Sequence, residues 1–116
     1  MEQNIIEIKS FQFAIRIVNL YKYLCTEQKE YVMSKQLLRS GTSIGANVAE
    51  SQQAQSRPDF ISKLSIALKE TTETKYWLRL LNATGYFHAQ DFTSILSDCV
   101  ELEKLLVTII RTTKQN

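Results

Sequence analysis

Apolar residues recur at intervals of three and four along almost the whole chain, which is the period of helices that bury one face. Breaks in this period predict four helices: about Ile5–Leu24, a second through Ser34–Ser51 to about Gln55, a third from about Arg57 to Asn82, and a fourth from about Ala89. Helices of about 20 residues joined by short links favour antiparallel neighbours. The pattern predicts an all-α fold, an antiparallel up-down-up-down four-helix bundle, with residues 1–116 forming a single domain.

The stretch Ser34–Ser51 is too small and polar for an ordinary core helix. Its apolar positions still keep one helical face: Leu37, Gly41, Ile44 and Val48. Gly41 and Gly45 lie one turn apart, and each costs a helix roughly 1 kcal/mol relative to alanine. We therefore expect another helix to approach closely there, since glycine leaves room for it. The alternative is a turn at residues 40–43, but the apolar period continues through both glycines.

A polar row runs beside that face: Ser40, Ser43, Asn47, and Glu50 or Ser51. If the second and third helices form a hairpin turning near Ser56 and Arg57, facing residues have numbers that sum to roughly 114. This rule predicts three sets of neighbours: Ser43 with Glu70, Asn47 with Ala67, and Arg39 or Ser40 with Glu73 and Thr74. Glu70 or Glu73 would then form a partly buried ion pair with Arg39, which can fix helix register. We interpret the row as structural, and a ligand site is the alternative.

The first helix carries two apolar rows, more than one helix–helix seam needs. One row is Phe11, Ala14, Val18, Tyr21 and Cys25, and the other is Phe13, Ile17, Leu20 and Leu24. We expect part of this broad face to pack against a second subunit.

The third helix has clear signals at both ends. Ser56, Pro58 and Asp59 suit a helix start. Serine can cap the first turn with its hydroxyl, proline is tolerated there because its missing N–H would have no partner, and an acidic side chain is stabilised by the positive end of the helix dipole. Gly85 is the expected left-handed residue after the last turn. The predicted seam of the third helix is Phe60, Leu64, Ala67, Thr71, Thr74, Leu78 and Leu81, and that of the fourth is Phe92, Ile95, Cys99, Leu102, Leu106 and Ile109.

Composition is ordinary for a globular protein, with 44% apolar and 22% charged residues and a net charge of +2. Dedicated nucleic-acid binders usually carry a larger basic excess. Cys25 and Cys99 match no metal-binding spacing, and we interpret them as buried reduced thiols of a cytoplasmic protein. No signal peptide or membrane span is expected.

No constellation for catalysis can be assembled from the sequence. His88 is the single histidine and falls in the connection before the fourth helix. No histidine and carboxylate cluster suggests a metal site in the bundle. The run G-T-S-I-G lacks the lysine of a phosphate-binding loop and the setting of a nucleophilic serine. We predict no enzyme, catalytic residue, metal or cofactor.

Positive charge concentrates in the third helix: the segment from Arg57 to Phe87 contains five basic residues and three acidic ones. Four of them fall mainly off the seam: Lys63, Lys69, Lys75 and Arg79. In a monomer they would form a solvated face. Repeated around a ring of subunits, they would form a basic surface able to contact phosphates, so we take them as candidate nucleic-acid-binding residues.

Two segments of the chain resemble a known family. R-S-G-T-S-I-G-A-N-V-A-E-S and D-F-I-S-K-L-S-I-A-L-K-E-T-T-E-T-K-Y-W-L are similar to the four-helix-bundle proteins encoded in intervening sequences of bacterial 23S rRNA genes, often labelled small ribosomal proteins. The chain also resembles the accessory protein of diversity-generating retroelements, a basic pentamer that binds nucleic acid and a reverse transcriptase. This chain differs from the accessory protein in being nearly neutral.

The resemblance implies an antiparallel four-helix bundle that assembles as a homopentamer. The family motif falls here on Arg39, Ser40, Ser43, Ile44, Asn47, Ala49 and Glu50, and on Phe60, Leu64, Ala67, Glu70 and Glu73. Together with the basic face, it favours a non-enzymatic oligomeric bundle that contacts structured RNA or DNA. The alternative is a protein-interaction scaffold without a nucleic-acid ligand.

Overall fold

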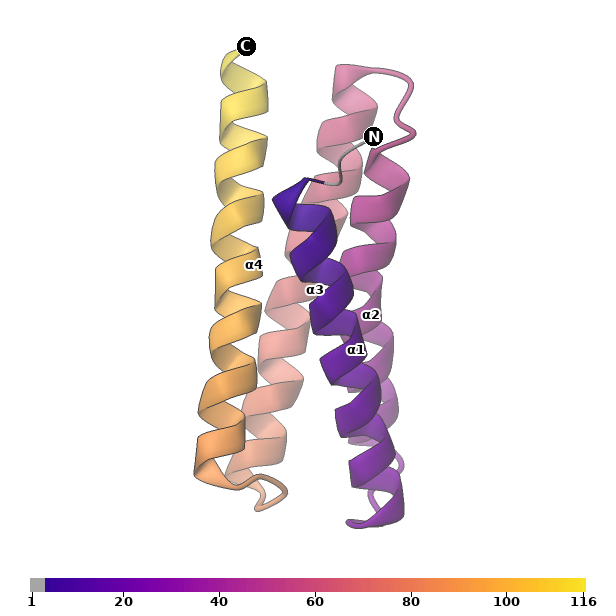
Figure 1. Ribbon diagram of the computed structural model, residues 1–116, viewed down its shortest axis with the longest axis vertical. Coiled ribbons are helices and arrows are strands. Elements are labelled where there is room, and N and C mark those ends of the chain that lie inside the picture. Colours follow the sequence, from indigo (N-terminus) through magenta and orange to yellow (C-terminus); the bar gives the residue numbers. More distant parts are fainter. Residues whose placement is uncertain (1–3) are drawn as a thin grey trace.

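Four long helices build the fold, and the computed structural model describes residues 4–116. They are α1 (Ile5–Thr26), α2 (Met33–Ser51), α3 (Arg57–Ala83) and α4 (Ala89–Gln115). Figure 1 shows each helix running opposite to the one before it, with both ends of the described chain at the same end of the bundle. The predicted all-α, antiparallel four-helix arrangement is confirmed. Each helix packs against its neighbours in sequence, and α1 and α4 make the least extensive contact.

Local sequence explains where α3 begins and ends. The Ser56 hydroxyl accepts the backbone N–H of Asp59, and Pro58 occupies the first turn. Gly85 follows the helix with φ of +91°, a conformation that glycine adopts without strain. These predictions are confirmed. The predicted end of the second helix near Gln55 is wrong, because α2 ends at Ser51. The N–H groups of residues 52–54 donate to carbonyls three residues back instead of four, and this tighter turn leads the chain into α3.

The start of α2 uses a capping residue that the sequence pattern did not reveal. Val32, at the N-cap, has no side chain able to accept a hydrogen bond. Instead, the Glu30 carboxylate accepts the backbone N–H groups of Val32, Met33 and Ser34 at 2.8–3.1 Å. Burial alone would raise the pKa of Glu30, but these three donors outweigh it and lower the pKa. Glu30 therefore satisfies the N–H groups that the first turn leaves unpaired.

One of the two apolar rows predicted for the first helix forms its core face. Phe13, Ile17 and Leu24 are buried, whereas Phe11 in the other row is 68% exposed. The predicted seam of α3 is buried except for Phe60, which lies half-buried. In α4 the buried row is Ile95, Cys99, Leu102, Leu106 and Ile110. Ile110 takes the place predicted for Ile109, because a helix with 3.6 residues per turn drifts away from a strict three-four pattern.

The glycines of α2 allow α1 to approach closely. A Cβ on Gly41 would lie 2.7 Å from Cγ1 of Ile17, and one on Gly45 would lie 3.2 Å from the carbonyl oxygen of Ser10. The prediction of a helix with a close neighbour is confirmed, and the alternative of a turn at residues 40–43 is wrong.

The two cysteines differ in their surroundings. Cys99 is fully buried, and burial raises the pKa of its thiol to about 12. Cys25 is only partly buried, so the prediction of two buried thiols is wrong for it. Its sulfur lies 3.8 Å from the Ser34 hydroxyl. Between residues 4 and 116, no helix combines the length and apolarity needed to cross a lipid bilayer.

Candidate functional site

Of the neighbours that the hairpin rule predicted, the set of Arg39 and Ser40 with Glu73 and Thr74 is confirmed. Arg39 forms ion pairs with Glu73 and, at 3.5 Å, with Glu70. The hydroxyl of Thr74 donates to that of Ser40 at 3.0 Å, and both residues are buried. Arg39 is 49% exposed and Glu70 only 15%, so the ion pairs lie at the edge of the seam. Residues whose numbers sum to about 114 therefore do face each other.

The other members of the row also have local partners. Ser43 donates to the carbonyl of Arg39 at 2.6 Å, and Asn47 donates to that of Ser43 at 2.9 Å. Glu50 pairs with Lys63 of α3 at 3.0 Å. Every buried side-chain nitrogen or oxygen in the described part of the chain has a hydrogen-bond partner. These contacts fit the interpretation of a row that sets the register of α2 against α3, and its half-exposed member Arg39 is already engaged by two carboxylates.

The ion pair extends to two aromatic residues. The indole N–H of Trp77 donates to Glu73 at 3.1 Å. That hydrogen bond, followed by the one from Arg39, lowers the pKa of Glu73. The Tyr76 ring packs edge-on against Trp77, with centroids 5.1 Å apart and planes at 77°. Tyr76 itself is 57% exposed. The network of Arg39, Glu73 and Trp77 therefore ends in an aromatic ring on the surface.

The four basic candidates of α3 fall into two pairs with different surroundings. Lys63 is paired with Glu50, and Lys75 with Glu103 of α4 at 2.8 Å. Lys69 and Arg79 are exposed, and within residues 4–116 neither has a carboxylate within 4 Å. Glu70 and Glu73, the acids near the middle of α3, pair with Arg39 of α2, and Lys69 adds only a longer-range attraction to Glu73. Only two of the four candidates therefore present an unpaired positive charge.

Two surface hollows follow the seam between α3 and α4. One, of about 760 Å³, is lined by Lys75, Tyr76, Arg79 and Phe92 among others. The second, of about 400 Å³, lies further toward the C-terminus of α4, and Leu68, Val107, Arg111 and Lys114 are among its lining residues. No acidic side chain lines either hollow. We call this surface the α3–α4 seam.

Arg111 and Lys114 are members of the seam that sequence reasoning missed. From the sequence alone, their position in the last turns of α4 indicates an interaction with the helix dipole and nothing more. The contact between Lys75 and Glu103 gives facing residues of α3 and α4 a sum near 178. A hairpin rule for this second pair of helices would have placed both residues opposite residues 64–67 of α3.

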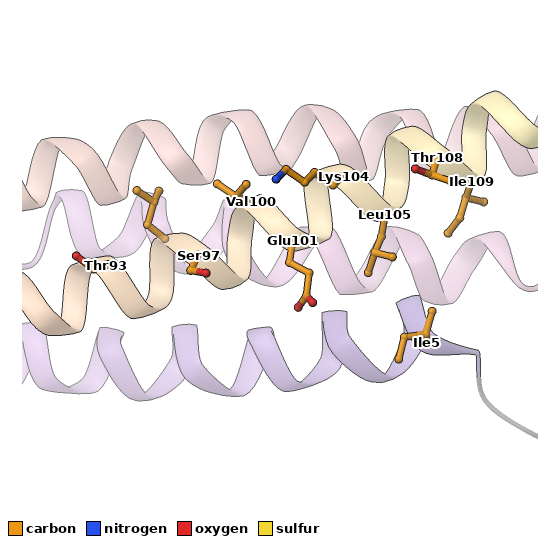
Figure 2. Close-up of a pocket in the computed structure, with 10 residues that line it drawn as sticks. Ile5, Thr93, Ser97, Val100, Glu101, Lys104, Leu105, Thr108 and Ile109 are labelled. Atoms are coloured by element: carbon orange, nitrogen blue, oxygen red, sulfur yellow. The ribbon is translucent and has the colours of Figure 1, made fainter.

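A more apolar groove lies where α4 passes α1. It has a volume of about 730 Å³ and is lined by Ile5 of α1 and a long face of α4. Figure 2 shows Leu105 and Glu101 pointing from α4 toward α1, with Ile5 at the start of α1. Beside it, a row of apolar side chains on α1 is exposed: Ile5, Ile8, Phe11 and Ile15. We call these four residues the α1 outer row.

His88 lies at the N-cap of α4, is exposed, and makes no capping hydrogen bond with its side chain. Among the described residues, no group of three or more histidine, cysteine or acidic side chains is arranged to hold a metal ion.

Comparison with known proteins gives a consistent result. The profile of the 23S rRNA-intervening sequence proteins matches residues 2–108. A crystal structure from Bacteroides thetaiotaomicron, of a protein with unknown function from the S23 ribosomal protein family, superposes with a TM-score of 0.91. The two sequences are 61% identical over 91% of this chain and 98% of the other. No curated protein matches the chain.

Proposed function

The chain belongs to the family of 23S rRNA-intervening sequence proteins, and from this premise we propose that it is a non-enzymatic homo-oligomer that binds nucleic acid through the α3–α4 seam. The observation that carries the proposal is the uneven charge of that surface. Arg79, Arg111 and Lys114 line its two hollows, and Lys69 is exposed on α3 nearby. Among the described residues, none of the four has a carboxylate within 4 Å. Glu103, the acid of α4 opposite Lys75, is already paired with that lysine.

A nearly neutral protein can bind phosphates when its charges are sorted by face. The acids of α4 support this sorting: Asp98 and Glu101 pair with Arg16 and Lys9 of α1, on the side away from α3. Phosphate contacts supply most of the affinity of non-specific nucleic-acid binding, and each contact adds to its salt dependence. A net charge of +2 therefore does not exclude the proposed activity.

Self-assembly would multiply this surface. The α1 outer row and the adjoining groove are apolar surface of the kind that monomers seldom expose and subunit interfaces bury. We propose that a second copy of the chain covers them, and that the closed assembly is a pentamer, as the family resemblance implies. A ring would present one seam per subunit to a single ligand. The proposed assembly acts in the cytoplasm, in keeping with two unpaired cysteines.

The test measures mass and binding together. Sedimentation equilibrium at micromolar concentration gives the number of subunits. Fluorescence anisotropy with labelled RNA and DNA oligonucleotides, single-stranded and duplex, gives affinities between 50 and 300 mM salt. Binding whose logarithm falls linearly with log salt supports the proposal. Absence of binding at 50 mM salt, or binding without a salt slope, would contradict its nucleic-acid part.

A protein-interaction scaffold is the second candidate, and the exposed α1 outer row favours it. Phe11 at 68% exposure is a large apolar side chain with no partner in the described part of the chain. An oligomer that ignores every oligonucleotide would support this candidate, because the apolar surface would then be the remaining recognition feature.

A further inference from the structure

The exposed face of α3 carries an aromatic ring between two unpaired basic residues. Lys69, Tyr76 and Arg79 follow one another at helical spacing along a single stripe, and all three are exposed. At 1.5 Å per residue, Lys69 and Arg79 lie about 15 Å apart along the axis. This is the length of roughly four stacked nucleotides at 3.4 Å each.

The Tyr76 ring is supported from beneath. Its edge packs on Trp77 at a centroid distance of 5.1 Å. Trp77 is itself held by the hydrogen bond from its indole to Glu73, and Glu73 by the ion pair with Arg39. A ring held in this way has little conformational freedom left to lose when a ligand packs on it. The polar row of α2 thus positions a surface aromatic.

The surroundings of Tyr76 suit a flat, negatively charged ligand. Tyr76 lines the hollow of about 760 Å³ that reaches across to Phe92 of α4, with Arg79 at its rim and no acid in its lining. Lys75 lies in the same hollow, neutralised by Glu103. An apolar floor with basic edges matches a nucleobase flanked by phosphates, whereas an aliphatic partner helix would gain nothing from Arg79.

We propose that Tyr76 is a stacking platform for an unpaired nucleobase, and that Lys69 and Arg79 contact phosphates of the same strand, one on each side of that base and a few nucleotides apart. The proposal rests on the proposed function and narrows its ligand to single-stranded segments, because bases within a duplex are already stacked. Base recognition through the π-face is tolerant of sequence, so selectivity should be for unpaired over paired nucleic acid.

The test uses a labelled 12-nucleotide oligouridine strand and a duplex of equal length with the full-chain protein. Tyr76→Ala should weaken single-strand binding by about 5- to 100-fold and duplex binding by less than about 2-fold. Tyr76→Phe should keep the wild-type affinity, since the ring remains, while Tyr76→Leu should behave like Tyr76→Ala. Tyr31→Ala, a similarly exposed tyrosine in the α1–α2 connection, is the matched control and should leave both affinities unchanged.

The second readout is photocrosslinking with 5-iodouridine, which should attach the strand to a peptide containing Tyr76. Unfolding midpoints of all variants confirm that losses of affinity are not losses of structure. If Tyr76→Ala binds oligouridine as tightly as wild type while both retain a salt slope, the stacking proposal is wrong and the proposed function stands. If wild type binds neither strand nor duplex, both are wrong. Equal losses for strand and duplex would also overturn the proposed preference for unpaired bases.

Discussion

Gly41 of α2 lies directly against Ile17 of α1: a Cβ added to Gly41 would be 2.7 Å from Cγ1 of a side chain that is fully buried. Gly41→Ala should therefore lower the free energy of unfolding by up to about 2 kcal/mol. The gain in helix propensity, about 1 kcal/mol, opposes an overpacking cost of roughly 1–3 kcal/mol. Urea denaturation at a fixed protomer concentration measures the difference.

Ala46→Gly is the control for Gly41→Ala, because Ala46 is exposed on the same helix. It should cost about 1 kcal/mol through propensity alone. A Gly41→Ala protein more stable than wild type would show that Ile17 moves aside without cost, and the close contact would not explain the glycine.

Glu30→Gln should lower the free energy of unfolding by about 1–2 kcal/mol at pH 7, since charge-assisted hydrogen bonds to the first turn of α2 become neutral ones. The folded-state pKa of Glu30 lies below the ordinary value of 4.5. Its contribution is thus complete above about pH 4.5 and is lost as the pH falls through the folded-state pKa. Thermal unfolding of both proteins between pH 3 and 7 should show the difference shrinking at the acid end.

Glu27→Gln changes an exposed acid of the same connection and should shift stability by less than about 0.5 kcal/mol. A difference between wild type and Glu30→Gln that stays constant down to pH 3 would contradict the capping role of the ionised carboxylate.

The helices and the register of α2 against α3 could be predicted because both follow from periodicity. Apolar spacing located every helix, and one assumed turn near Ser56 sufficed to pair Arg39 with Glu73 and Ser40 with Thr74. Glu30 could not be found in this way. A capping side chain usually occupies the N-cap itself, whereas here the backbone folds so that a residue two positions earlier reaches the donors, with Lys29 at φ of +55°.

The candidate site was only half predictable for a related reason. The sequence shows how many basic residues α3 carries, but it does not show which of them meet an acidic residue of another helix. Lys75 is neutralised by Glu103, a contact between residues 28 positions apart. Arg111 and Lys114 come beside Leu68 of α3 only through the same long-range pairing of α3 with α4. Tyr76 was assigned no role, because its significance depends on what surrounds the ring.

Arg39→Ala should destabilise the protein by about 1 kcal/mol, less than the few kcal/mol expected for a fully buried pair. The reason is that Arg39 is 49% exposed, so water screens the charges once the pair is broken. A double-mutant cycle with Glu73→Gln, followed by urea denaturation, isolates the coupling. Unchanged stability combined with weaker ligand binding would show instead that the polar row is a binding site.

Lys69→Gln with Arg79→Gln should reduce the salt dependence of single-strand binding. Loss of two phosphate contacts lowers the slope of log affinity against log salt by about 1.4 for a single strand. Lys22→Gln with Lys35→Gln removes the same net charge from exposed positions on α1 and α2 and serves as the control. Equal slopes for the two double variants, measured by anisotropy, would show that net charge matters and the seam does not.

Phe11→Ser separates assembly from folding. In a monomer the side chain is 68% exposed, so the change should alter unfolding of the isolated chain little. In the proposed oligomer the ring is buried by a second copy, and its loss should weaken self-association by about 10- to 100-fold per interface, as burial of a phenylalanine side chain implies. Sedimentation velocity across a concentration series measures this shift toward smaller species.

Tyr31→Ser, an exposed aromatic residue outside the α1 outer row, should leave the subunit number unchanged. A wild-type chain that stays monomeric at micromolar concentration would make the assembly part of the proposal wrong. If Phe11→Ser both dissociates the oligomer and lowers the salt slope of nucleic-acid binding, the seams of several subunits must contact one ligand together. If it dissociates the oligomer and the slope is unchanged, each bundle binds by itself, and assembly serves another purpose.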